Sequence, residues 1–169
     1  MLSVGFIGVG KMGRGMCENI IKKGYTTTVY DTDSGALVQF KDGATLASSS
    51  LEVFLDSDVI FLSLPNSDVV ESIVGEFLQE DFTGKTIVDV STSYPESTKA
   101  LHAKCTAEGG QFVDAPLLGS PADTAAGTAP CMISGDREAV DHVWDIISSY
   151  ASPIDNMGPI GSAHTVKIA

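Results

Sequence analysis

Gly8-Val9-Gly10-Lys11-Met12-Gly13 is the stretch of sequence that decides the fold, because it joins an apolar strand pattern at 2–7 to a helical pattern at 11–23. In such a GxGxxG turn, the first glycine makes a tight bend, the second lets the backbone approach a pyrophosphate, and the third lets the helix pack on the strand. Free amides at the helix start then bind anionic oxygens. The stretch predicts a dinucleotide site; a glycine-rich turn without a ligand is the simpler alternative.

Outward from this stretch, strand patterns alternate with helical patterns along the chain. This alternation predicts an α/β fold of the Rossmann type, a doubly wound, mostly parallel sheet with helices on both faces. The region 115–128, rich in Gly, Pro and Ala, is expected to be the least regular. Further strands are expected at 26–30, 44–47, 58–64, 86–90, 111–114, 130–134 and 152–156, and further helices at 34–40, 50–55, 67–78, 95–108 and 136–148.

The composition excludes several classes of protein. The chain has 169 residues, of which 43% are hydrophobic and 19% charged, a mix that excludes disordered, collagen-like and disulfide-scaffold proteins. The net charge of −12 disfavours nucleic acid and anionic membranes as partners, so backbone amides must hold any polyanionic ligand. No apolar run reaches about 18 residues, and no signal peptide is evident. Cys17, Cys105 and Cys131 form no CxxC pair, which predicts buried free thiols in a cytoplasmic protein.

Asp31 follows Gly13 by eighteen residues, at the end of the second expected strand. A carboxylate there accepts hydrogen bonds from the adenosine ribose diol and repels a 2′-phosphate. No Arg or Lys occurs between Asp31 and Phe40, which favours NAD over NADP as cofactor. A helix cap or a solvated turn residue is the alternative for Asp31, and FAD or S-adenosylmethionine sites use similar residues.

Two polar segments follow central strands at the edge where open α/β sheets bind ligands. Leu64-Pro65-Asn66 ends one strand, and Pro65 is expected to shape the wall of the crevice. Ser91 and Thr92 end the next strand, and their hydroxyls are expected to reach cofactor oxygens or an amide. Capping of the following helices is an equally good interpretation of both segments.

Lys167 is the only Lys or Arg in the last thirty residues, on an expected helix that starts at Ser162 or Ala163 after a glycine turn. A lysine shielded in a cleft can act as a general acid–base, although a solvated surface lysine is the commoner case. His164 lies on the same helical face and is a second candidate. No histidine has a second ligand at metal spacing, so we expect no metal site.

Five ordered segments resemble the β-hydroxyacid dehydrogenase family, which includes 3-hydroxyisobutyrate dehydrogenase. They span nearly the whole chain, and the glycine segment matches beyond its glycines, at Met12 and Met16. The segments are 6–16 (FIGVGKMGRGM), Leu64-Pro65, 89–95 (DVSTSYP), 114–127, beginning DAP, and 158–167 (GPIGSAHTVK).

The resemblance implies an NAD-dependent oxidoreductase acting on a small 3-hydroxy acid or its semialdehyde. It implies Lys167 as the catalytic residue and the loop Leu118-Gly119-Ser120 as the substrate-carboxylate site. It assigns the cofactor to Gly8, Val9, Gly10, Lys11, Met12, Gly13, Asp31, Leu64, Pro65 and Thr92. The family's full-length members also imply a homo-oligomer.

The chain departs from the family pattern at three places. Leu118 replaces a serine that helps bind the substrate carboxylate, and Ser120 is the candidate substitute. Ala163 replaces the last glycine of the lysine segment. The family's asparagine one turn after the lysine falls beyond Ala169, as does the helical second domain. We therefore expect a dinucleotide-binding domain at 1–161, the start of an interdomain helix at 162–169, and little activity from this length of chain alone.

The sequence is also compatible with three other functions. A 6-phosphogluconate dehydrogenase would need cationic phosphate contacts that the substrate loop lacks, and imine reductases commonly depart from the lysine. A non-catalytic nucleotide-binding or scaffold domain with this fold is the alternative from another class.

Overall fold

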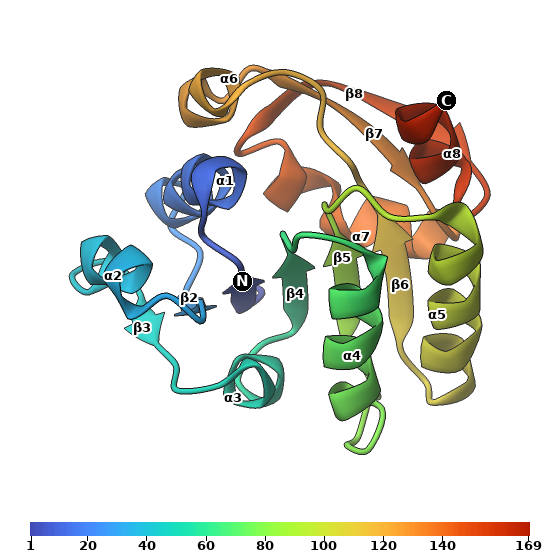
Figure 1. Cartoon of the computed structure of the whole chain (residues 1–169), viewed down its shortest axis with the longest axis horizontal. Helices are drawn as coiled ribbons and strands as arrows, with labels where there is room; N and C mark the ends of the chain where they lie inside the picture. The colour runs from blue at the N-terminus through green and yellow to red at the C-terminus, as the bar shows by residue number, and fades with distance from the viewer.

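The expected apolar runs form one central sheet of eight strands, with helices on both of its faces (Figure 1). The computed structural model describes residues 1–169. The strands are β1 (Val4–Ile7), β2 (Thr27–Tyr30), β3 (Thr45–Leu46), β4 (Val59–Leu62), β5 (Thr86–Asp89), β6 (Gln111–Asp114), β7 (Ala129–Ser134) and β8 (Ala151–Gly158). The helices are α1 (Lys11–Lys22), α2 (Ser34–Leu37), a 3-10 turn (Val38–Phe40), α3 (Ser50–Leu55), α4 (Ser67–Phe77), α5 (Pro95–Ala107), α6 (Pro121–Ala126), α7 (Arg137–Ile147) and α8 (Ser162–Ile168).

The strand order is β3-β2-β1-β4-β5-β6-β7-β8, and every neighbouring pair except β6 with β7 is parallel. The chain first builds outward from β1 to β3, then returns to the other side of β1 and continues with β4. Connections therefore leave β1 and β4 in opposite directions, which opens a crevice at the carboxyl ends of these strands. The doubly wound, Rossmann-like sheet predicted from the alternation of patterns is confirmed.

Each central strand places alternate side chains on opposite faces of the sheet, as strand geometry requires. In β4, Val59 and Phe61 join a core cluster with residues of α1 and α7. Ile60 and Leu62 join a second cluster with residues of α3, α4 and α5. Since both faces are covered at the centre of the sheet, β1 and β4 contain no polar side chains at all, rather than alternating with polar residues.

Two parts of the fold differ from expectation. The region 115–128 contains an ordered helix, α6, with Pro121 at its start and a left-handed glycine, Gly127, at its end. The expected helix at 34–40 divides into α2 and the 3-10 turn. None of the helices combines the length and the apolar character needed to cross a bilayer.

Candidate functional site

The glycine turn lies between β1 and α1, and its three motif glycines are required for different reasons. Gly8 has φ of 96°, and a Cβ there would lie 2.0 Å from the carbonyl oxygen of Ser63. A Cβ at Gly13 would lie 2.0 Å from the carbonyl oxygen of Gly8. A Cβ at Gly10 would meet no protein atom within 4 Å. The fold therefore demands Gly8 and Gly13, whereas the space beside Gly10 is open for a ligand.

A hollow of about 590 Å³ lies along this turn, at the crevice between β1 and β4. The predicted cofactor residues from three segments meet there, because β1, β2 and β4 all end at the same edge of the sheet. Gly10 caps α1 without any side chain bonded to the helix start, so the amides of the first turn are available to an anion. The residues of the hollow include Gly8, Gly10, Lys11, Met12, Gly13, Tyr30, Asp31, Leu64 and Pro65.

Asp31 is fixed at the end of β2 by two hydrogen bonds. The backbone N–H groups of Val9 and Asp33 donate to its Oδ2 and Oδ1, each at 2.8 Å. Asp31 is therefore a turn residue, one alternative raised from the sequence, and it also lines the hollow along the glycine turn. A carboxylate oxygen accepts more than one hydrogen bond, so these contacts leave acceptor capacity on the Asp31 side chain.

Two bases of α1 line the hollows around the glycine turn. Lys11 lines the same hollow as Asp31, and Lys11 and Arg14 together line a neighbouring hollow with Asp33 and Gly35. Both bases precede Asp31 in the sequence, on α1, whereas the segment from Asp31 to Phe40 contains none. Arg14 also pairs with Glu18 at 3.0 Å on the exposed side of α1.

The segments after β4 and β5 are joined by Ser91. Its Oγ accepts from the N–H of Leu64 at 2.8 Å and donates to the carbonyl of Leu62 at 3.2 Å. Ser91 is buried, and its hydroxyl holds two strand ends together; of the expected partners, cofactor oxygens or an amide, it meets a backbone amide, that of Leu64. Thr92 is exposed, and it lines a small hollow of about 300 Å³ that also contains Asn66. The Asn66 side chain caps α4, which is the alternative interpretation given above for this segment.

The predicted substrate loop leads into α6. Ser120 caps this helix: its Oγ accepts from the N–H of Asp123 at 3.3 Å, and its own N–H donates to the Asp123 carboxylate at 2.7 Å. Gly119 has φ of 102°, and a Cβ there would lie 2.6 Å from the same carboxylate. The side chain of Leu118 is exposed. The Ser120 hydroxyl is therefore engaged within the loop, while Leu118 faces outward.

The Lys167 ammonium donates to the carbonyl of Leu117 at 2.8 Å. The lysine is half-buried, and the bond joins α8 to the segment that precedes Leu118. The structure thus brings Lys167 to Leu117, the residue just before the predicted substrate loop, although the two are fifty residues apart in the sequence.

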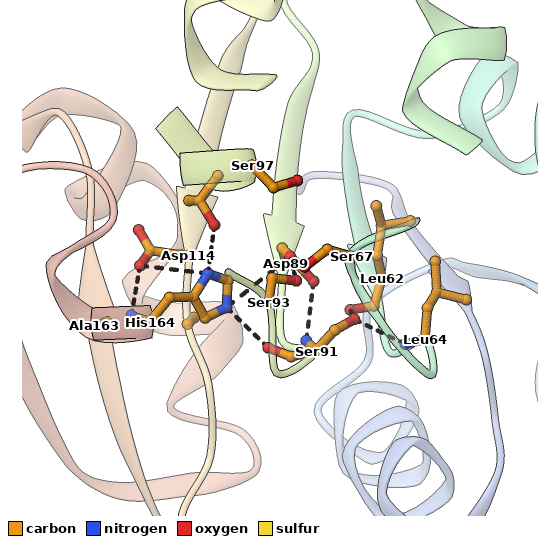
Figure 2. A network of polar contacts seen from close by, with 12 residues as sticks. Leu62, Leu64, Ser67, Asp89, Ser91, Ser93, Ser97, Asp114, Ala163 and His164 are labelled. Carbon is orange, nitrogen blue, oxygen red and sulfur yellow. Dashed lines mark hydrogen bonds and ion pairs between the residues drawn. The ribbon is translucent and has the colours of Figure 1, made fainter. Parts of the chain in front are cut away.

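His164 does not face the cleft, contrary to expectation. It is fully buried, with its ring between the carboxylates of Asp89 and Asp114 (Figure 2). The ring Nδ1 lies 2.7 Å from the Thr98 Oγ1, and Nε2 lies 2.8 Å from the Ser91 carbonyl oxygen. These contacts make His164 part of the interior and exclude it as a direct proton donor to a ligand in the cleft.

Burial raises the pKa of Asp89, an effect that His164 and the hydroxyls of Ser93 and Ser91 oppose. Sequence reasoning missed this cluster as a unit. The available signal was the aspartate that directly follows two apolar residues at the end of β5 and again at the end of β6. No group of three or more His, Cys, Asp or Glu side chains is arranged to hold a metal ion.

A family model described as the NAD binding domain of 6-phosphogluconate dehydrogenase matches residues 3–158. The 2-(hydroxymethyl)glutarate dehydrogenase of Eubacterium barkeri is 33% identical, over 99% of this chain and 57% of that protein. The NAD-dependent L-serine dehydrogenase of Pseudomonas aeruginosa is 32% identical, over 99% of this chain and 58% of that protein.

Among solved structures, the 3-hydroxyisobutyrate dehydrogenase of Mycobacterium tuberculosis superposes with a TM-score of 0.94 at 24% identity, over 99% of this chain and 58% of that one. This similarity is one of fold. The chain thus spans a little more than half the length of these relatives. By the match over residues 3–158, the chain belongs to the family of 6-phosphogluconate dehydrogenase-type NAD-binding domains, with β-hydroxyacid dehydrogenases as relatives at about 30% identity.

Proposed function

We propose that this chain is the cofactor-binding half of an NAD-dependent oxidoreductase that transfers hydride between the nicotinamide and a small 3-hydroxy acid or its semialdehyde. The observation that carries the proposal is the open space beside Gly10, at the uncapped start of α1. Neither packing nor backbone conformation requires a glycine there, whereas a pyrophosphate approaching the turn does.

We call the hollow along the glycine turn, lined by Gly10 and Asp31 among others, the cofactor hollow. It offers different groups to the pyrophosphate and to the adenosine ribose. The helix start offers amides to the pyrophosphate, and Asp31 offers a carboxylate to the ribose diol. We assign NAD as the preferred cofactor on the charge of Asp31. Lys11 lies in the same hollow and opposes this preference, so the preference is expected to be moderate.

Lys167 is the proposed acid–base group. Bound NAD supplies the hydride chemistry at the carbinol or carbonyl carbon. The lysine ammonium donates a proton to the substrate oxygen during reduction, and the amine accepts it during oxidation. The Leu117 carbonyl, 2.8 Å from Nζ, holds this side chain beside the loop from Leu118 to Ser120. We propose that the backbone of that loop, rather than the engaged Ser120 hydroxyl, binds the substrate carboxylate.

The substrate class rests on the relatives, whose names specify 2-(hydroxymethyl)glutarate, L-serine and 3-hydroxyisobutyrate. Each of these relatives is longer than this chain. We therefore propose that residues 1–161 form the cofactor domain, that 162–169 begin the connection to a second, helical domain, and that the second domain completes the cleft.

Calorimetric titration of the 169-residue chain tests the cofactor assignment. We expect NAD to bind weakly and in a one-to-one ratio, and small hydroxy acids to show negligible turnover. Absence of NAD binding at millimolar concentration would contradict the proposal. Binding without any turnover in a version extended by the helical domain would favour the non-catalytic scaffold instead.

A further inference from the structure

The first turn of α8 is capped by side chains of the sheet rather than by its own residues. The N–H groups of Gly161 and His164 donate to the Asp114 carboxylate at 3.0 and 2.9 Å. The N–H of Ala163 donates to the Ser134 Oγ at 3.0 Å, and Ser134 in turn donates to Asp114 at 2.5 Å. The start of the helix that carries Lys167 is therefore fixed to the ends of β6 and β7.

The His164 ring extends this attachment to β5. Its Nε2 lies 2.8 Å from the carbonyl oxygen of Ser91, visible as a dashed contact in Figure 2. A carbonyl oxygen can only accept a hydrogen bond, so Nε2 must carry the proton. The other ring nitrogen, Nδ1, faces the Thr98 hydroxyl, which can either donate or accept. Only the contact with Ser91 thus has a fixed direction.

Ser91 is also the residue that fixes the cofactor side of the site. Its hydroxyl holds Leu64, which lines the cofactor hollow, and Thr92 follows it in the chain. On the other side, Lys167 follows His164 by three residues, about one turn of α8 on the same side of the helix. The His164 ring therefore connects α8, which carries Lys167, to Ser91 at the strand ends beside the cofactor hollow.

We propose that His164 is a positioning residue, whose Nε2–H bond to the Ser91 carbonyl fixes the Lys167 helix relative to the strand ends that hold the cofactor. The proposal rests on the proposed function in taking Lys167 and the cofactor hollow as parts of one site. It predicts that NAD binding in the hollow changes the surroundings of the Lys167 side chain, and that this change depends on the bond between His164 and Ser91.

The choice of variant follows from the surroundings of the ring. The charged groups facing it are Asp89 from β5, 4.0 Å from Nε2, and Asp114 from β6, 3.7 Å from Nδ1; α5 contributes the Thr98 hydroxyl. An apolar replacement would leave two buried carboxylates facing a cavity, which is strongly destabilising. The amide nitrogen of glutamine reaches about as far as Nε2, whereas that of asparagine reaches only about as far as Nδ1. His164→Gln should therefore keep the bond to Ser91, and His164→Asn should lose it.

The test uses the 169-residue chain labelled with ¹³C at the lysine side chains, with the Lys167 signal identified by its loss in Lys167→Met. We expect NAD to shift this signal in the unmodified chain and in His164→Gln. In His164→Asn, NAD should still bind within about threefold of its original affinity while the shift is lost. His102→Asn, the same change at the histidine that pairs with Asp136 on the surface, should leave the shift intact.

Two results would overturn the proposal: an unchanged shift in His164→Asn, or a lost shift in His164→Gln that still binds NAD. A separate measurement, the ¹⁵N spectrum of the His164 ring in the unmodified chain, requires neither a variant nor a ligand. A protonated Nε2 is expected, and an unprotonated Nε2 overturns the proposal even if the variants fail to fold. Failure of NAD to bind the unmodified chain would instead count against the proposed function.

Discussion

The backbone N–H of Val9 donates to the carboxylate of Asp31 at 2.8 Å, so the acid at the end of β2 is bonded directly to the glycine turn after β1. The glycine turn and the Asp31 carboxylate, which we propose bind the pyrophosphate and the ribose, are therefore held in one fixed relation. A substitution at Asp31 consequently acts on the turn as well as on the ribose contact.

Because Asp31 bonds to Val9 as well as lining the hollow, two substitutions of Asp31 are expected to have different effects. Asp31→Asn keeps an acceptor for Val9 but removes the charge that repels a 2′-phosphate, so the preference for NAD over NADP should narrow. Asp31→Ala also removes the hydrogen bonds to the ribose, and a lost bond to a charged group costs about 1.5–3 kcal/mol, or roughly ten- to a hundredfold in NAD affinity. Calorimetric titration of both nucleotides measures the effects. Stronger binding of NADP than of NAD by the unmodified chain would refute the assignment.

Gly10→Val tests whether the open space beside Gly10 belongs to the ligand. The φ of Gly10 is −71°, which any residue adopts, and no protein atom lies within reach of the new side chain. The variant should therefore fold normally and lose NAD binding. Gly75→Val on α4 is the matched control, because its Cβ also meets nothing within 4 Å, and it should still bind. Circular dichroism and calorimetry distinguish the outcomes; normal NAD binding by a folded Gly10→Val would place the site elsewhere.

Lys167→Ala tests the proton transfer in a version extended by the helical domain of a relative. Removal of a general acid–base group should lower kcat by roughly 10²–10⁴-fold. Lys104→Ala, an exposed lysine on α5, should leave the rate unchanged. An unaffected rate in the Lys167 variant would assign the proton transfer to another group, which cannot be the buried His164.

Features of the fold that arise from residues close together in the sequence could be predicted, whereas features that depend on distant residues could not. The strands and the glycine turn were predictable because apolar runs and the turn are local signals. The direction of β7 was not, because a buried strand has the same apolar pattern whether it runs parallel or antiparallel. The short α6 was hidden by its Gly- and Pro-rich surroundings, although Ser120 and Asp123, three residues apart, form the capping pattern that marks a helix start.

The cluster around His164 shows the limit of such reasoning at the site. Its members come from β5, β6, β7, α5 and α8, and no spacing along the chain connects them. A histidine on a short expected helix was equally consistent with a cleft or an interior. Only the packing of α8 against the strand ends decides between these positions.

The pH dependence of stability should include a contribution from Asp58 at the start of β4. The N–H and the hydroxyl of Ser3 donate to this carboxylate at 2.9 and 3.0 Å, and the backbone bond is the main cause that lowers the pKa of Asp58. Because the folded pKa lies below the unfolded value of about 4, the stabilisation is present above that value and is lost as the pH falls through the folded pKa.

Denaturant unfolding of the unmodified chain and of Asp58→Asn, at pH values from 7 down to 2.5, measures this contribution. The difference in unfolding free energy should be largest at neutral pH and shrink toward zero below about pH 4. Asp145→Asn on the exposed face of α7 serves as the control. A difference between the chain and Asp58→Asn that stays constant across this range would contradict the assignment to the ionised carboxylate.

The three cysteines should resist thiol reagents in the folded chain. Cys17, Cys105 and Cys131 are buried and free, and burial raises the pKa of each thiol, to about 12 for Cys105 and Cys131. Since the thiolate is the reactive form, Ellman's reagent should detect almost no thiol natively and three after unfolding. Fast reaction of one equivalent in the native state would show that a cysteine is more accessible than its place in the core allows.

The three motif glycines of the turn after β1 are constrained by different things, and this has a consequence for evolution. Gly8 and Gly13 are held by the packing of the polypeptide on itself, so any descendant that keeps this fold must retain them, whatever it does. No protein atom requires a glycine at position 10, so under the proposed function only the ligand does. A lineage that abandoned its nucleotide would be free to change that position first. If the proposed function holds, a glycine at position 10 is expected in chains of this shape that bind a dinucleotide, and any residue is expected there in chains that share only the architecture.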